Sequence, residues 1–218
     1  MKEQEDEKII VQSLIGGSQL SFYLRCLKSL FTFCQVRIKL QLHTDGSLSE
    51  EDKDFIHTEL DGTKVTITNS SENKSRVLDC LKGRPNCQKV RKDSIWGIEF
   101  FDPVFAFPED PISFYLDADI LFLRPFSGLF DRNQVKNGAV FLKDTQWDAY
   151  SFRPWQMLTS KGKPQTVKGI TTGLVFWDKT VIDWDYLDWF LGEHRLHQIP
   201  EWIMPTAQAG LAHRCNAK

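Results

Sequence analysis

The chain has 218 residues, 41% of them hydrophobic, which is enough for one α/β domain with a sizeable core. A formal net charge of -2 and a pI near 6.2 argue against nucleic acid as the main partner, because such partners usually select a basic face. No apolar stretch reaches membrane-spanning length and the acidic start is unlike a signal peptide, so we expect a soluble, cytoplasmic protein with no transmembrane segment.

The first 60 residues predict two strands and two helices. Residues 8–14 predict a strand that ends at Gly16 and Gly17, which either let the backbone approach a nucleotide or form an ordinary turn. Apolar residues between 20 and 31 recur at helical spacing. Residues 36–44 alternate between apolar and polar, as a strand does. Ser49 followed by Asp52 resembles a capping box before a helix that runs to about residue 60.

The next segment continues the alternation of strands and helices. Residues 65–67 predict a third strand, and residues 72–82 and 94–104 predict helices. This repeated order predicts a largely parallel sheet covered on both faces. The interval from 82 to 92 is the densest basic run, and a solvated surface is its simplest interpretation.

Two carboxylates interrupt the most apolar part of the chain. A run that reads as a buried strand stops at Asp117 and Asp119, and a second apolar run, ended by Pro125, predicts another strand. Burying an ionised carboxylate costs several kcal/mol, so the pair needs either a counter-cation or exposure to solvent at the end of the strand. Hard oxygen ligands suit Mg²⁺ or Mn²⁺. A surface turn between two strands is the alternative.

The remainder of the chain is rich in tryptophan. Residues 139–142 predict a strand followed by Asp144 and Asp148, at the edge of the sheet where ligands bind. Either carboxylate contacts substrate hydroxyl groups, acts as a base, or is ordinary surface. Six of the seven Trp residues lie from Trp147 onward, and aromatic faces suit sugar rings. Trp147 and Trp155 are candidates for contact with a sugar ring because they flank loop-like sequence, whereas Trp184 and Trp189 are predicted to pack a helix on the core.

The segment Asp117-Ala118-Asp119, with Tyr115-Leu116 before it and an apolar run to Pro125 after it, resembles the DxD signature of GT-A-fold nucleotide-sugar glycosyltransferases, specifically glycosyltransferase family 8. The resemblance covers most of the chain. It implies an α/β fold, a Rossmann-like α/β/α sandwich with a mostly parallel central sheet. It also implies one domain over residues 1–218, in which residues 1–126 bind the nucleotide sugar and residues 127–218 bind the acceptor.

The resemblance also implies a set of site residues. Mn²⁺ or Mg²⁺ would be held by Asp117 and Asp119, with His213 as a third ligand. The donor would be contacted by residues of three segments, Ala118, Arg91, Thr172 and Gly173, where residues 169–178 resemble the family strand that usually begins Asn-Ser-Gly. Catalytic roles fall to Asp144 and to Gln208, which matches the Gln of a Glu-Gln pair. The chain departs from the family at Ala207, in place of that Glu, and at Glu99, where many relatives carry a Lys.

The sequence therefore predicts a metal-dependent glycosyltransferase that moves a sugar from a nucleotide-diphosphate sugar to a glycan or glycoconjugate acceptor. A phosphatase of the haloacid dehalogenase type also uses Asp-x-Asp with Mg²⁺, but there the motif continues Gly-Thr, whereas Ile120-Leu121 follows here. A non-catalytic relative that binds a nucleotide sugar or glycan remains open, because fold does not fix function and the Lys, Asn and Glu are missing.

Overall fold

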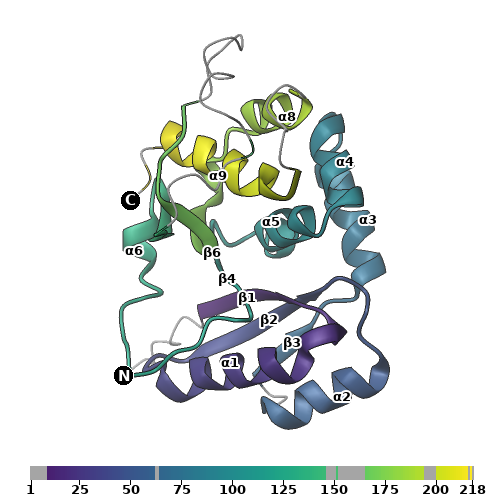
Figure 1. The fold of residues 1–218 in the computed structure, drawn as a ribbon, viewed down its shortest axis with the longest axis vertical. Helices are drawn as coiled ribbons and strands as arrows, with labels where there is room; N and C mark the ends of the chain where they lie inside the picture. Colours follow the sequence, from purple (N-terminus) through teal and green to yellow (C-terminus); the bar gives the residue numbers. More distant parts are fainter. Residues whose placement is uncertain are drawn as a thin grey trace.

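A six-stranded sheet of order β3-β2-β1-β4-β6-β5 forms the centre of the chain (Figure 1). The computed structural model describes residues 9–61, 64–145, 151, 165–193, 200–215 and 217. Strands β3, β2, β1 and β4 are parallel, whereas β6 runs antiparallel to both β4 and β5. The strands are β1 Ile9–Ile15, β2 Ile38–Thr44, β3 Val65–Ile67, β4 Ile112–Leu116, β5 Ala139–Lys143 and β6 Ile170–Asp178.

Helices cover both faces of the sheet, which gives the three-layer α/β/α architecture (Figure 1). One layer contains α1 Leu20–Phe33 and α2 Glu50–Glu59. The other contains α3 Ser70–Cys80, α4 Pro85–Asp93, α5 Ile95–Ala106, α8 Trp184–Gly192 and α9 Ile203–Arg214. The short α6 Arg132–Val135 precedes β5. In the described part of the chain, no helix is long and apolar enough to cross a membrane.

Each face of the sheet carries its own apolar cluster. The cluster under α1 and α2 is built around residues such as Leu27, Leu40 and Phe114. The opposite cluster is built around residues such as Phe101 and Trp177. Because successive strand residues point to opposite faces, β4 and β6 contribute to both clusters.

The predicted fold class is confirmed, and so are most of the predicted elements. In β2, Ile38, Leu40 and Leu42 are buried as the alternation predicts. The capping box is present, with Ser49 and Asp52 each bonding the other's backbone N–H at the start of α2. Helix α4 was not predicted. Its sequence signal is Pro85 at the first helical turn, where a proline loses no hydrogen bond.

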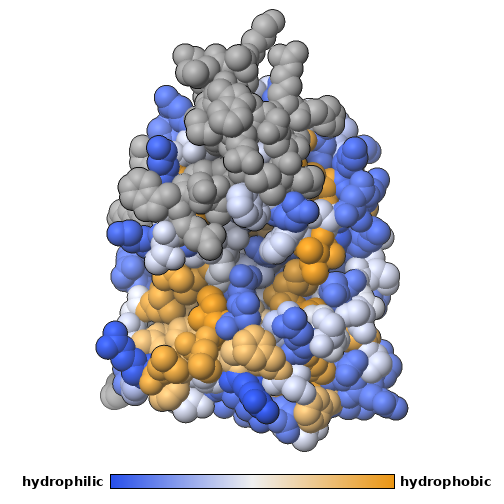
Figure 2. All heavy atoms as spheres, in the orientation of Figure 1, coloured by the Kyte–Doolittle hydropathy of each residue, from blue (hydrophilic) through white to orange (hydrophobic). Residues whose placement is uncertain are grey.

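The strand predicted after the acidic pair is wrong. Residues 120–125 form no strand. Both edges of β4 are occupied, by β1 and β6, and this segment runs along α1. The Phe122 N–H donates to Ser29 Oγ at 2.9 Å, and the Phe122 ring stacks on Phe126. Leu121 and Leu123 are 56% and 79% exposed. Figure 2 shows apolar side chains gathered over this region, beside α1.

Candidate functional site

Asp117 directly follows β4, where that strand meets the start of β6. Its backbone N–H donates to the Gly173 carbonyl at 2.7 Å. Its Oδ1 accepts a hydrogen bond from the Tyr115 hydroxyl at 2.9 Å. The carboxylate is therefore oriented by its own strand and by β6. Asp119 is exposed, while the Ala118 side chain between the two acids is buried in the core.

The charge on Asp117 is unfavourable in the protein alone. Burial, to which the nearby charge of Asp119 adds, raises the pKa of Asp117 to about 6, although the Tyr115 hydrogen bond opposes this shift. Hard oxygen donors whose negative charge has no cationic partner among the described residues fit a divalent cation such as Mg²⁺ or Mn²⁺. Asp117 and Asp119 would hold such an ion.

A third carboxyl group, that of Glu99 in α5, lies beside the pair. Glu99 is 7% exposed and accepts a hydrogen bond from the Thr172 hydroxyl. Burial and the charges of Asp117 and Asp119 raise its pKa well above the usual value, which favours the protonated form. The position where many relatives of the resembled family carry a cation thus presents a neutral or negative group to the site.

His213 is not brought to the acidic pair. It lies exposed in the last turn of α9 and its Nε2 is 2.6 Å from Gln165 Oε1. Within the described ranges, no three His, Cys, Asp or Glu side chains group closely enough to hold a metal ion. Among the described residues, Asp117 and Asp119 are the side chains placed to hold a metal, and Mg²⁺ commonly takes further ligands from substrate phosphates and water.

Gly173 lies where β6 passes closest to Asp117. A Cβ atom at this position would lie 3.0 Å from Asp117 Oδ2, so the glycine makes room for the carboxylate. The pairing of β5 with β6 is irregular here, since Phe141 pairs with Val175 but Leu142 pairs with Thr171. Thr172 is buried against Glu99. Thr172 and Gly173, the two β6 residues expected near the donor, therefore lie against Glu99 and Asp117 respectively.

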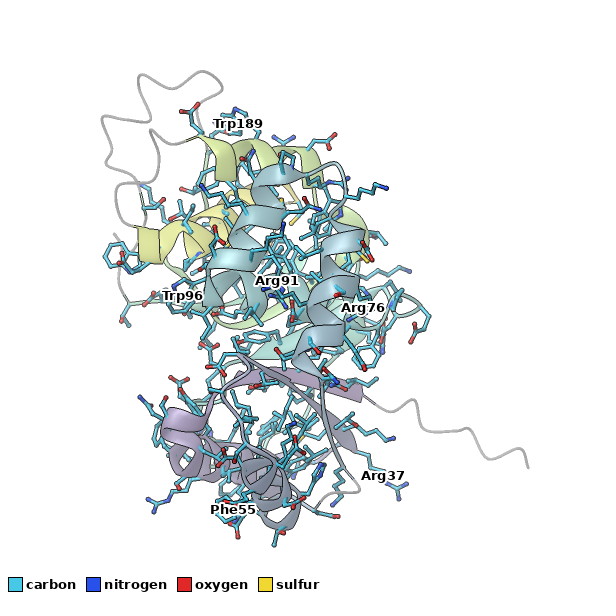
Figure 3. The ribbon with its side chains drawn as sticks, turned by 90° about the vertical axis from the view of Figure 1, so that its right-hand side faces the viewer. Arg37, Phe55, Arg76, Arg91, Trp96 and Trp189 are labelled. Carbon is cyan, nitrogen blue, oxygen red and sulfur yellow. The ribbon has the colours of Figure 1, made fainter. Side chains whose placement is uncertain are left out.

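The role expected for Arg91 is corrected by the structure. Arg91 is 4% exposed and forms a two-pronged ion pair with the buried carboxylate of Asp102, with Nη2 to Oδ2 at 2.8 Å. Figure 3 shows Arg91 inside the helical layer. A guanidinium used in this way joins α4 to α5 and is not free to contact a donor.

Gln208 also lies in the core. It is buried in the middle of α9, and its Oε1 accepts a hydrogen bond from the Trp177 indole at 3.4 Å. The expected helix is present, but the helix uses Gln208 to satisfy a buried indole N–H. We therefore propose no catalytic role for Gln208.

Asp144 is placed at the same edge of the sheet as Asp117. It follows β5, and its N–H donates to the Gly169 carbonyl at 2.8 Å, just before β6 begins. Because β6 pairs with both β4 and β5, this edge brings Asp144 and Gly173 onto adjoining strands. Trp147, Asp148 and Trp155 lie outside the described residues.

The glycines after β1 have a packing role. A Cβ at Gly16 would lie 2.5 Å from Asp45 Oδ2, and the Gly17 N–H donates to Ser47 Oγ at 2.8 Å. The turn interpretation accounts for both glycines, because each closes against the loop after β2.

Two residues of the acidic site were missed as functional candidates. The contact of Tyr115 with Asp117 could have been predicted, because Tyr115 lies two residues before Asp117 and a strand places such residues on one face. Glu99 was noted only as a departure from the family. Its acidic side chain within the apolar run Ile98–Phe101 was the available signal that it needed a special environment.

The sequence matches no protein-family model, and no curated protein is similar to it in sequence. Solved structures are similar in fold. Mouse xyloside xylosyltransferase 1, in its apo form, has a TM-score of 0.56 at 13% identity, with 95% of this chain and 79% of that chain covered. Galactosyltransferase LgtC, in complex with donor and acceptor sugar analogues, has a TM-score of 0.57 at 11% identity, with 92% and 70% covered.

The mannosyltransferase Ktr4p from S. cerevisiae, in complex with GDP, has a TM-score of 0.53 at 12% identity, with 94% of this chain and 66% of that chain covered. Identities this low establish the fold alone. The chain has the GT-A fold, which solved xylosyl-, galactosyl- and mannosyltransferases share.

Proposed function

We propose that the protein is a metal-dependent glycosyltransferase that uses a nucleotide-diphosphate sugar as donor. The observation that carries the proposal is the pair Asp117 and Asp119 at the end of β4, with Asp117 held by Tyr115 and packed against Gly173. The solved structures of similar fold include complexes with GDP and with donor and acceptor sugar analogues.

The proposed roles follow from the placement of the side chains. A divalent cation on Asp117 and Asp119 would neutralise the diphosphate as negative charge develops on the leaving group. Tyr115 keeps the Asp117 carboxylate oriented toward the end of the sheet. Asp144, on the adjoining strand end, is the candidate to contact an acceptor hydroxyl. The acceptor itself is a carbohydrate or glycoconjugate in this proposal.

The donor class is tested by thermal shift with UDP-, GDP- and dTDP-sugars, each with and without Mn²⁺. A ligand that binds only the folded state raises Tm by mass action, so we expect one class of sugar nucleotide to raise Tm only when Mn²⁺ is present. Asp119→Ala should remove this shift. The matched control is Asp54→Ala, which removes an exposed carboxylate from α2.

The proposal is wrong if no sugar nucleotide gives an Mn²⁺-dependent shift, or if Asp119→Ala responds as the parent does. A shift that the Asp54→Ala variant also loses would be attributed to general charge and not to the acidic pair.

A non-catalytic nucleotide-sugar binder is the second candidate. The observation that favours it is Glu99, whose acidic side chain lies beside the pair and cannot attract a diphosphate. Catalysis can be detected without knowing the acceptor, because water can replace it once the leaving group is stabilised. We expect slow, Mn²⁺-stimulated release of nucleoside diphosphate from the donor, lost in Asp117→Asn. Tight binding with no release over days would favour the binder.

A further inference from the structure

Trp96 is the one tryptophan in the first half of the sequence, and its side chain is 37% exposed. It lies in the first turn of α5 and belongs to neither apolar cluster, whereas Trp177, Trp184 and Trp189 all pack in one of them. In the described part of the chain, no aromatic ring stacks on Trp96 and no group accepts from its indole N–H. Part of the indole is therefore open to a ligand.

The helical spacing places Trp96 beside the acidic site. Residues three apart lie on one face of a helix, so Glu99 is the neighbour of Trp96 one turn along α5. The charges of Asp117 and Asp119 reach Glu99 and raise its pKa. Glu99 also accepts from the Thr172 hydroxyl of β6. Because helical side chains lean toward the N-terminus, the indole extends from Glu99 toward the N-terminal end of α5.

Figure 3 shows at which end of the sheet Trp96 lies. Trp96 and Arg37 are on opposite sides of the ribbon in that view, Trp96 on the left and Arg37 on the right. Arg37 directly precedes β2, so the parallel strands start on its side and end on the side of Trp96. Asp117 follows β4 at that end, and so does Asp144 after β5, since both strands run antiparallel to β6. Ligands of open α/β sheets bind at this end.

The neighbouring groups select the chemistry of a ligand. An aromatic face contacts C–H groups favourably, and carboxyl oxygens accept hydrogen bonds from hydroxyl groups. A sugar ring offers both, with C–H groups on its faces and hydroxyl groups at its edge. Ile95, which is 47% exposed, adds apolar surface beside Trp96 in the same turn. Asp117 and Asp119 disfavour an anionic ligand that brings no cation.

We propose that Trp96 is a binding platform for a sugar ring at the acidic site, with its indole stacked on the C–H face of that ring. The inference rests on the proposed function, which brings a sugar to Asp117 and Asp119. The sugar of the donor and the sugar of the acceptor share this chemistry, and titration with each distinguishes them.

The test follows the indole N–H resonances of ¹⁵N-tryptophan-labelled protein by NMR. The Trp96 resonance is assigned by its absence in Trp96→Phe. With Mn²⁺ present, the protein is titrated with UDP-, GDP- and dTDP-sugars and with the corresponding nucleoside diphosphates. Methyl glycosides of glucose, galactose, mannose and xylose are titrated with Mn²⁺ and nucleoside diphosphate, and also without either.

We expect a saturable shift of the Trp96 resonance with a sugar. A shift with a sugar nucleotide that exceeds the shift with its nucleoside diphosphate identifies the sugar of the donor. A shift with a methyl glycoside identifies the sugar of the acceptor. Both results support the platform, because each requires a sugar ring and not the nucleotide alone.

Two variants measure the contribution of the aromatic face. Trp96→Ala should raise the dissociation constant of that sugar ligand about three- to ten-fold, and Trp96→Phe should raise it less because it keeps an aromatic face. Neither should change the affinity for nucleoside diphosphate and Mn²⁺, which a loss of structure would lower. Phe55→Ala is the matched control, because Phe55 is an aromatic residue of α2 that is 44% exposed in the other helical layer (Figure 3).

The proposal is overturned if no sugar shifts the Trp96 resonance, or if the nucleoside diphosphate shifts it as far as the sugar nucleotide does and no glycoside shifts it. It is also overturned if Trp96→Ala binds the sugar ligand as the parent does. Failure of the proposed function gives a different result, since no sugar nucleotide would then raise Tm with Mn²⁺. The methyl glycosides without nucleotide would still decide whether Trp96 binds a sugar.

Discussion

Asp117 lies where the apolar interior of the sheet ends, and burial there raises the pKa of its carboxyl group. Its pKa of about 6 exceeds the value near 3.9 expected in an unfolded chain. The folded protein therefore binds more protons than the unfolded chain between these two values. The free energy of unfolding therefore falls as the pH rises from about 4 to about 6. This loss of stability is complete above about pH 6 and absent below about pH 4.

Asp117→Asn should remove that cost. The variant keeps an oxygen that can accept from Tyr115 but carries no charge, so metal-free protein should gain about 1–3 kcal/mol near pH 8. The gain should shrink as the pH falls from about 6 to about 4. Thermal unfolding of parent and variant across this range measures it. An equal difference in Tm at every pH would contradict the burial argument.

Gly173 was expected to contact the donor, but an added Cβ would lie nearest to the Asp117 carboxylate. Gly173→Val should therefore displace Asp117 and weaken metal-dependent nucleotide binding itself, together with sugar transfer. Gly138→Ala is the control, because a Cβ there would meet only Cys215 O at an ordinary 3.7 Å. Binding of nucleoside diphosphate and Mn²⁺ by Gly173→Val at the affinity of the parent would return the glycine to a contact with the sugar.

At the scale of elements, one buried carboxylate joins three helices. Asp102 of α5 pairs with Arg91 of α4 and accepts from Asn73 of α3, to which Arg76 also donates. Removing one partner of a buried ion pair leaves an uncompensated charge, which typically costs about 3–5 kcal/mol.

Arg91→Met should lower the free energy of unfolding by that amount, about 3–5 kcal/mol, in urea titration. Arg91→Met combined with Asp102→Leu should recover much of the loss, because two apolar side chains replace the pair. The exposed neighbour provides the control variant Lys92→Met. If Arg91→Met instead left stability unchanged and abolished donor binding, the ion pair would not be its main role.

Local patterns predicted those elements whose burial repeats with a regular period. The alternation of Ile38, Leu40 and Leu42 and the pairing of Ser49 with Asp52 are both contained within a few residues. Residues 120–125 begin with a continuous apolar run that also predicts a strand, yet no edge of β4 is left for them to pair with. Only the order of the strands in space excludes a strand there, and a single sequence does not contain that order.

The residues of the acidic site also differ in whether a local sequence pattern could predict them. Asp117 and Asp119 stand out locally because charge interrupts an apolar run. The contact of Glu99 with Thr172 joins α5 to β6, and Arg91 meets Asp102 only because the chain turns at Ser94 between two helices. These contacts depend on tertiary packing, which composition and spacing do not specify.

At the scale of the whole molecule, two apolar clusters share two strands. In β4, Phe114 belongs to one cluster and Tyr115 to the other, and in β6 the same holds for Phe176 and Trp177. Strand β6 comes from the second half of the sequence, but it lies between β4 and β5. Residues 1–126 and 127–218 therefore contribute to one sheet, and loss of either cluster exposes strands that the other needs.

We expect the described sheet and its two helical layers to unfold in a single cooperative transition. Trp177, Trp184 and Trp189 report on one cluster, and among the described residues no Trp packs on the other. Cys26 is buried in α1, the helix that packs on that opposite face, and it reports on this helix through thiol labelling followed by mass spectrometry. In urea, tryptophan fluorescence, far-UV circular dichroism and Cys26 labelling should give one midpoint, as two-state unfolding requires. Protection of Cys26 beyond the fluorescence midpoint would show that the two faces unfold separately, because the shared strands β4 and β6 would then not couple them.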